Sequence, residues 1–137
     1  MTNGRSVTRG AHHIGLTVPD LAETRQFFLQ TLGFEQVGDV PDYPAVFLKD
    51  TNTMITLWQA QDPATATPFD RKNVIGLHHL AMLVDDHAAL DDLHERLRQT
   101  AGVDIEFAPE PLGDGGVRHM MTNIPGGIRV EFLSPSA

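Results

Sequence analysis

The sequence predicts an α+β fold of two tandem βαβββ modules, whose strands form a curved mixed sheet around a trough suited to a metal ion and a small ligand. The first observation is an internal repeat. Residues 12–20 and 78–86 share a His-His pair, an alternating apolar run that ends in valine, and an acidic residue. The second is that a single amphipathic helical pattern follows each copy. The third is that three short strand-like stretches follow each helical pattern.

The first module is expected at residues 11–60 and opens with a strand. Every second side chain of that strand is large and apolar, so this face should pack on a helix, while His13 begins the smaller and more polar face. Asp20 is a good helix N-cap, Glu23 completes a capping-box pattern, and Gly33 ends the helix. Three further strands are predicted at Phe34–Val40, Ala45–Lys49 and Thr53–Gln59.

The second module is expected at residues 76–134 and repeats this order. His79 begins the more polar face of its first strand, and Asp86 caps a helix that carries a stripe of buried leucines. Residues 61–75 contain two prolines and no periodicity, so we expect them to link the modules, and residues 1–10 to form an N-terminal extension. Three strands are predicted after the second helix, at Val103–Ala108, Val117–Thr122 and Ile128–Leu133.

The composition narrows the classes of partner. The formal net charge is −8, and an acidic surface repels phosphate backbones and anionic lipids, so we expect neither nucleic acid nor a membrane as partner. The chain has no cysteine, which excludes disulfides, thiolate metal sites and a cysteine nucleophile. No apolar run approaches the roughly 18 residues of a membrane span, and no signal-peptide pattern is present. We therefore expect a cytoplasmic protein that acts on a small molecule.

Two histidines and one glutamate occupy corresponding places in the repeat. His13 and His79 begin the first strands, and Glu131 lies in the last strand of the second module, where Thr56 is its counterpart in the first. Imidazole nitrogen and carboxylate oxygen suit iron, manganese, nickel, cobalt or zinc, and three protein ligands leave positions open for water and substrate. A strand histidine is more often a hydrogen-bonded core or surface residue, but a carboxylate in an apolar strand is costly without a partner. We therefore predict a divalent-metal site of His13, His79 and Glu131, with Glu131 also catalytic.

Five further residues are candidates for the same trough. His119 and Arg118 lie on the next-to-last predicted strand, where one of them can reach the trough as an acid/base or an anion clamp, and surface placement is the alternative. Trp58 shares a face with Thr56, although a core aromatic is the competing interpretation. Arg129 can meet a substrate anion or pair with an acidic neighbour. We predict that His119 is catalytic and that the other four bind substrate.

Four segments of the chain resemble the vicinal oxygen chelate superfamily, also called the glyoxalase, bleomycin-resistance and extradiol dioxygenase superfamily. These segments are His13–Val18, Phe27–Phe34, His79–Val84 and Gly127–Phe132, and the likeness in order and spacing covers about residues 11–134. The resemblance implies paired βαβββ modules with a metal in the trough. It also implies a substrate or intermediate bound through adjacent oxygens, with the metal stabilising an oxyanion as a Lewis acid.

The four ligand positions of the family map onto His13, Thr56, His79 and Glu131. Thr56 departs from the Glu or Gln that glyoxalase I has there, which weakens a strict glyoxalase I assignment, because a threonine hydroxyl is a poor base. The remaining set is similar to that of extradiol dioxygenases and fosfomycin-resistance thiol transferases, and to the facial triad of non-haem iron oxygenases. The resemblance also suggests a homodimer, and it leaves open whether His13 meets His79 and Glu131 within one chain or across an interface.

The function expected from these features is that of a metal-dependent enzyme on a small vicinal-oxygen substrate: a dioxygenase, a lyase or isomerase, or a thiol transferase. The first alternative is a metal-independent drug- or metabolite-binding protein like the bleomycin-resistance proteins. The second is a structural or regulatory module whose trough has lost its chemistry. Fold alone does not decide among these classes, since one fold hosts many chemistries.

Overall fold

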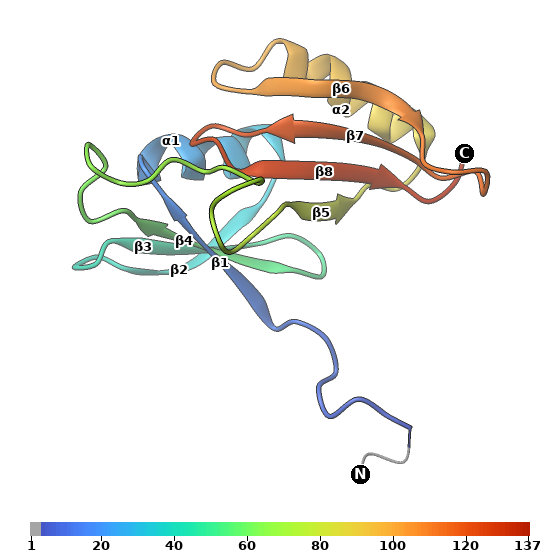
Figure 1. Ribbon diagram of the computed structural model, residues 1–137. Coiled ribbons are helices and arrows are strands. Elements are labelled where there is room, and N and C mark those ends of the chain that lie inside the picture. The colour runs from blue at the N-terminus through green and yellow to red at the C-terminus, as the bar shows by residue number, and fades with distance from the viewer. Residues whose placement is uncertain (1–3) are drawn as a thin grey trace.

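The computed structural model describes residues 4–137, which form two modules built to the same plan (Figure 1). The first module comprises β1 (His13–Val18), α1 (Leu21–Gln26), a π-helical turn η1 (Phe27–Thr31), β2 (Glu35–Val40), β3 (Ala45–Lys49) and β4 (Met54–Gln59). The second comprises β5 (Leu80–Leu83), α2 (His87–Arg98), β6 (Asp104–Pro111), β7 (Arg118–Asn123) and β8 (Arg129–Ser134). The expected N-terminal extension, residues 1–10, lies partly outside the described residues.

Each module contributes one four-stranded mixed sheet. The strand order is β1-β4-β3-β2 in the first sheet and β5-β8-β7-β6 in the second. The first strand of each module runs parallel to the last, and the other neighbours are antiparallel. The two sheets therefore have one topology, and the predicted α+β fold of two βαβββ modules is confirmed.

The helix starts follow from local sequence. The Asp20 carboxylate accepts a hydrogen bond from the backbone N–H of Glu23 at 3.1 Å, and the Asp86 carboxylate accepts one from Ala89 at 2.8 Å. Both bonds satisfy donors that the first helical turn leaves without a partner. Gly33, with a φ of 77°, follows the first helical segment as the expected stop.

The first helical segment differs from the continuous helix that the pattern predicts. The α-helix ends at Gln26, and the wider turn η1 follows, in which the N–H of Leu32 donates to the carbonyl of Phe27 at 3.2 Å. Phe27 and Phe28 are neighbours in sequence, yet only 3% and 0% of their surfaces are exposed. The wider turn lets both rings enter the core, because it rotates neighbouring side chains apart about the helix axis by less than a regular α-helix does.

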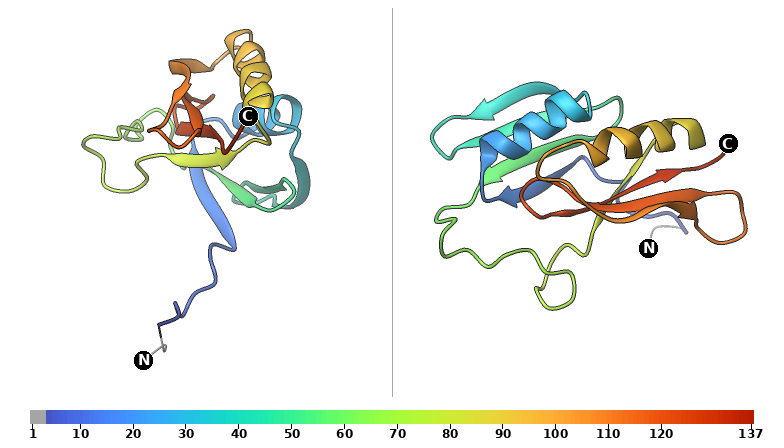
Figure 2. Two further views of the ribbon diagram at one scale, coloured as in Figure 1. Left: turned by 90° about the vertical axis from the view of Figure 1, so that its right-hand side faces the viewer. Right: turned by 90° about the horizontal axis from the view of Figure 1, so that it is seen from above.

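The core lies between the helix-facing sides of the two sheets and is shared by both modules. Figure 2 shows α1 and α2 lying side by side on the same side of the sheets. Leu16 and Phe28 of the first module belong to the same buried cluster as Leu90 and Phe132 of the second. The buried hydroxyl of Thr24 also donates to the carbonyl of Pro125 at 2.9 Å, across the junction of the modules. The helix faces are thus used to join the modules, which leaves the opposite sheet faces for other contacts.

Strand predictions hold closely except at β6. That strand runs three residues further than the expected Val103–Ala108, and its pairing with β7 shifts register twice, after Ile105 and after Phe107. Bulges of this kind re-aim side chains. No helix within residues 4–137 has the length and apolar character needed to cross a membrane.

Candidate metal and substrate site

Glu131 lies on the face of the second sheet that is turned away from the core. Along β8 the side chains alternate, so Val130 and Phe132 enter the core while Glu131 points to the other side. Only 8% of its surface is exposed. His79, immediately before β5, brings Nε2 to 3.3 Å from Oε1 of Glu131. A nearly buried carboxylate thus has an imidazole beside it, which is the environment that the sequence pattern predicts for two metal ligands.

His119 approaches the same carboxylate from the neighbouring strand β7. Its Nδ1 lies 2.5 Å from Oε2 of Glu131, and only 12% of the imidazole side chain is exposed. The ring of Phe107 lies 4.9 Å away between centroids, and a carboxylate oxygen of Glu110 lies 3.9 Å from Nε2. The two oxygens of Glu131 therefore face two different imidazoles, so that a proton can pass between Glu131 and His119 without movement of the backbone.

Arg118 corrects one expectation. It pairs with Ser134 of β8 in register, which places it on the helix-facing side of the second sheet, and its guanidinium bonds to Asp91 of α2 at 3.2 Å. Of the two neighbours on β7, His119 is the one on the Glu131 face, since successive strand residues point to opposite sides. The geometry gives Arg118 no part in this site.

Arg129 shares the face of Glu131 and is held by an acidic neighbour. Its Nε and Nη2 donate to the two oxygens of Glu106 at 3.0 and 2.7 Å, and Arg71 from the inter-module segment donates to the same carboxylate at 2.5 Å. The hydrogen bonds from Arg129, aided by the charges of both guanidiniums, hold the pKa of Glu106 below its usual value. The bond to Glu106 in turn raises the pKa of Arg129, and the negative charge of Glu131 adds to this effect.

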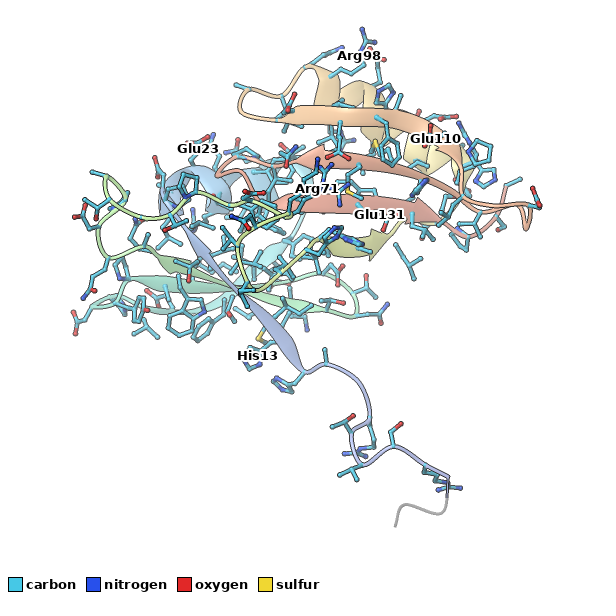
Figure 3. The ribbon with its side chains drawn as sticks, in the orientation of Figure 1. His13, Glu23, Arg71, Arg98, Glu110 and Glu131 are labelled. Atoms are coloured by element: carbon cyan, nitrogen blue, oxygen red, sulfur yellow. The ribbon has the colours of Figure 1, made fainter. Side chains whose placement is uncertain are left out.

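His13 lies apart from this group. It is exposed, it pairs in register with Met54, and it stands at the projecting start of β1, away from Glu131 (Figure 3). Within residues 4–137 of one chain, no three His, Cys, Asp or Glu side chains converge in a way that could hold a metal ion. One chain therefore brings together His79 and Glu131, whose donor atoms suit a divalent metal, and leaves the third predicted ligand separate.

The outer face of the first sheet carries an aromatic group next to Thr56. The indole N–H of Trp58 donates to the buried hydroxyl of Thr56 at 2.8 Å. Tyr43 packs edge-on against Trp58 with ring centroids 4.7 Å apart, and Phe47 lies 6.0 Å away. Gly15 gives this group room, because a Cβ there would stand 3.2 Å from the Thr56 hydroxyl and 3.3 Å from the indole nitrogen, which is tighter than ordinary contact. The predicted pairing of Thr56 and Trp58 on one face is what the structure has.

Sequence reasoning missed Arg71 and Glu106, which tie the inter-module segment to the second sheet. Arg71 lies in the segment expected to be a plain linker, and the two residues are 35 positions apart. Glu106 lies at the β6 bulge, where alternation no longer tells which side a residue faces. The only available signal was the presence of Arg129 on a mostly buried face, which requires a carboxylate partner from some other part of the chain.

Comparison with known proteins agrees with this architecture. The sequence model of the Glyoxalase/Bleomycin resistance protein/Dioxygenase superfamily matches residues 10–132. A curated relative, 2-epi-5-epi-valiolone epimerase from Actinomyces sp, is 28% identical over 145 residues, which cover 90% of this chain and 78% of that protein.

Solved structures share the fold at low sequence identity. A glyoxylase/bleomycin resistance protein/dioxygenase domain from Frankia sp. EAN1pec gives a TM-score of 0.79 at 23% identity, covering 92% of this chain and 91% of the other. The fosfomycin resistance protein FosX from Listeria monocytogenes gives a TM-score of 0.75 at 18% identity, covering 96% and 94%. A variant of FosX was solved with Mn(II) and 1S,2S-dihydroxypropylphosphonic acid.

Proposed function

The chain belongs to the glyoxalase/bleomycin resistance protein/dioxygenase superfamily, and from this premise we propose that it is a metal-dependent enzyme acting on a small molecule with adjacent oxygen atoms. The observation that carries the proposal is the contact of His79 with Glu131, 3.3 Å between donor atoms on a mostly buried face. A carboxylate in such a place needs a cation or hydrogen-bond donors beside it. A divalent metal ion would meet this need at the repeat-related positions that the sequence singles out.

We propose that the third ligand is His13 of a second copy of the chain. Two features support a shared site: His79 and Glu131 of one chain have no third ligand among residues 4–137, and His13 is exposed at a projecting strand end (Figure 3). A symmetric homodimer would then contain two such sites, each with His79 and Glu131 from one copy and His13 from the other.

The bound ion, which we propose to be iron, manganese, nickel, cobalt or zinc, would supply Lewis-acid stabilisation of an oxyanion on the substrate. The protein side chains would carry the proton transfer. Glu131 and His119 lie 2.5 Å apart, which supports the proposal that they would act as an acid/base pair, removing a proton from the substrate and returning one. Trp58 and Thr56 would form the opposite, less polar wall of the substrate site in the dimer.

Among the reactions open to such a site, we propose isomerisation or epimerisation first. The curated relative at 28% identity is an epimerase, and a neighbouring imidazole and carboxylate would be able to take a proton from the substrate and return it. Addition to an oxygen-bearing substrate is the second reaction, and it is consistent with the FosX variant of the same fold, which was solved with Mn(II) and a dihydroxy compound. Both reactions use one oxyanion-stabilising centre, so the metal requirement is common to them.

Metal-independent binding of a drug or metabolite is the competing function. The aromatic group of Trp58, Tyr43 and Phe47 favours it, because such rings bind flat or apolar ligands without a metal. Thr56, which replaces a carboxylate or amide ligand of glyoxalase I, favours it as well. This function and the enzyme differ in one measurable property, the need for His79.

The test is elemental analysis of the purified protein with the His79→Ala variant. We expect about one divalent ion per chain in the wild type and its loss in the variant. His94→Ala is the matched control, because His94 lies on α2 and outside the site, and it should keep the metal. If the protein takes up no ion from iron, manganese, nickel, cobalt or zinc solutions, the proposed metal-dependent enzyme is wrong and metal-independent binding becomes the function to test.

A further inference from the structure

A small cavity of about 270 Å³ lies beside Arg129, between the inter-module segment and the second sheet. Its floor comes from the ends of β7 and β8, and its wall comes from a turn in which the carbonyl of Asp70 accepts from Asn73 and Val74. The residues that line it are Phe69, Asp70, Arg71, Lys72, Asn123 and Arg129.

The charge of this cavity is opposite to that of the chain. Three of the ten lysines and arginines line it, namely Arg71, Lys72 and Arg129, whereas the chain as a whole carries −8. Two carboxylates offset them in part. Asp70 accepts from the backbone N–H of Lys72 at 2.9 Å, and Glu106 is shared by the two guanidiniums. The balance of these five groups is one positive charge.

Several N–H donors at the cavity have no acceptor among residues 4–137. Arg129 uses Nε and Nη2 on Glu106, which leaves Nη1, and Arg71 uses Nη1, which leaves Nε and Nη2. The Lys72 ammonium makes no ion pair within residues 4–137. Guanidinium and ammonium groups with free donors form short, charge-assisted hydrogen bonds to oxyanions.

We propose that this cavity is a subsite for a small tetrahedral oxyanion, such as the phosphate or phosphonate group of a substrate. Arg71, Lys72 and Arg129 would donate to its oxygens, and the Asn123 amide would add a neutral donor. Arg129 and Glu131 are two residues apart on one face of β8, which separates them by about 7 Å along the strand. A compound of three or four carbons that carries an oxyanion at one end would therefore place its other oxygens beside Glu131. This substrate class rests on the proposed function, while binding of the oxyanion itself does not.

The chain offers a matched pair of variants, because it contains only two lysines, Lys49 and Lys72. Calorimetric titration of inorganic phosphate into metal-free protein, at constant ionic strength against chloride, should show saturable binding. Lys72→Gln should weaken phosphate binding about tenfold, the usual effect of losing one charged hydrogen bond. Lys49→Gln removes the same charge on β3 and should leave binding unchanged.

A second measurement uses the same two lysines. Phosphate should protect Lys72, and not Lys49, from an acetylating reagent, as followed by peptide mass spectrometry. The proposal is overturned if metal-free protein shows no saturable phosphate binding, or if the two lysine variants bind phosphate equally. Because no metal is added, these outcomes are independent of the elemental analysis, so failure of the subsite and failure of the proposed function can be told apart.

Discussion

Replacement of Glu106 by Gln tests the ionic contacts that tie the inter-module segment to the second sheet. The carboxylate of Glu106 accepts from Arg71 and twice from Arg129, and the Arg129 side chain is only 9% exposed. Removing one partner of a fully buried ion pair costs about 3 to 5 kcal/mol. Glu106 is 26% exposed and glutamine keeps one acceptor oxygen, so we expect a loss of about 1 to 2 kcal/mol at pH 7 after allowance for solvent screening.

The effect should depend on pH in a defined direction. The pKa of Glu106 is lower in the folded chain than its ordinary value of 4.5, because Arg129 and Arg71 favour the ionised form. A lowered folded pKa gives stability that is present above pH 4.5 and is lost as the pH falls through the folded pKa. The difference between wild type and variant should therefore be full at pH 7 and should shrink below pH 4.5.

Denaturant unfolding at pH 7 and at several values below pH 4.5 measures this difference. For a domain of this size, 1 to 2 kcal/mol corresponds to a fall in Tm of roughly 3 to 6 °C. Glu95→Gln is the control, because Glu95 and its partner Arg98 are both 58% exposed, and it should cost less than about 0.5 kcal/mol. An equal loss in both variants at pH 7, or a Glu106 effect that persists unchanged in acid, would refute the reasoning.

Three further predictions concern other parts of the chain. Glu131→Gln should lower metal affinity at least about tenfold with little change in Tm, since a neutral amide is a weaker ligand. Full affinity in this variant, measured beside the exposed control Glu95→Gln, would remove Glu131 from the ligand set. Thr24→Val leaves the Pro125 carbonyl without its donor and should lower the free energy of unfolding by about 1 to 3 kcal/mol in denaturant. Thr24→Ser keeps the hydroxyl and should lower it by about 1 kcal/mol. Equal losses in the two variants would mean that this hydrogen bond contributes nothing to stability. Gly15→Ala should push the indole of Trp58, the chain's single tryptophan, and so change its emission spectrum, while Gly115→Ala, with nothing within 4 Å, should not. Unchanged emission in the Gly15 variant would contradict the close approach of Gly15 to the indole.

Local chemistry made much of the fold predictable. Each aspartate cap bonds to the backbone N–H three residues further along, so Asp20 and Asp86 could be assigned as helix N-caps without knowledge of the rest of the chain. The strand alternation around Glu131 likewise follows from period two and from the large side chains on either side. Because the sequence repeats, the same order of strands and helix could be assigned to both modules, and this predicted two matching sheets.

Features that depend on distant partners were not predictable in the same way. The π-helical turn arises because Phe27 and Phe28 must both enter a core that residues of the second module complete. The ion pairs of Glu106 with Arg129 and Arg71 depend on a bulge in β6 and on a segment whose sequence has no periodicity. Such contacts depend on how the two modules pack together. No local sequence pattern within either module determines that packing.

The proposed metal site lies between these cases. Repeat symmetry related His13 to His79 and pointed to Glu131, and the structure brings His79 and Glu131 together. The repeat does not say how the two modules are arranged, within one chain or between two chains. The position of His13 relative to His79 and Glu131 therefore could not be derived from it. The predicted strand made both Arg118 and His119 candidates, and the structure shows that His119 is the one in contact with Glu131.

Mixing of His13→Ala with His79→Ala tests most directly whether the metal site is shared by two copies. Each variant alone should bind no metal. If each site takes His13 from one copy and His79 and Glu131 from the other, half of the dimers formed by co-refolding are mixed, and each mixed dimer has one intact site. The mixture should therefore recover about a quarter of the wild-type metal content. If neither variant binds metal and the mixture recovers none, the site does not combine ligands from two copies, and the proposed arrangement is wrong.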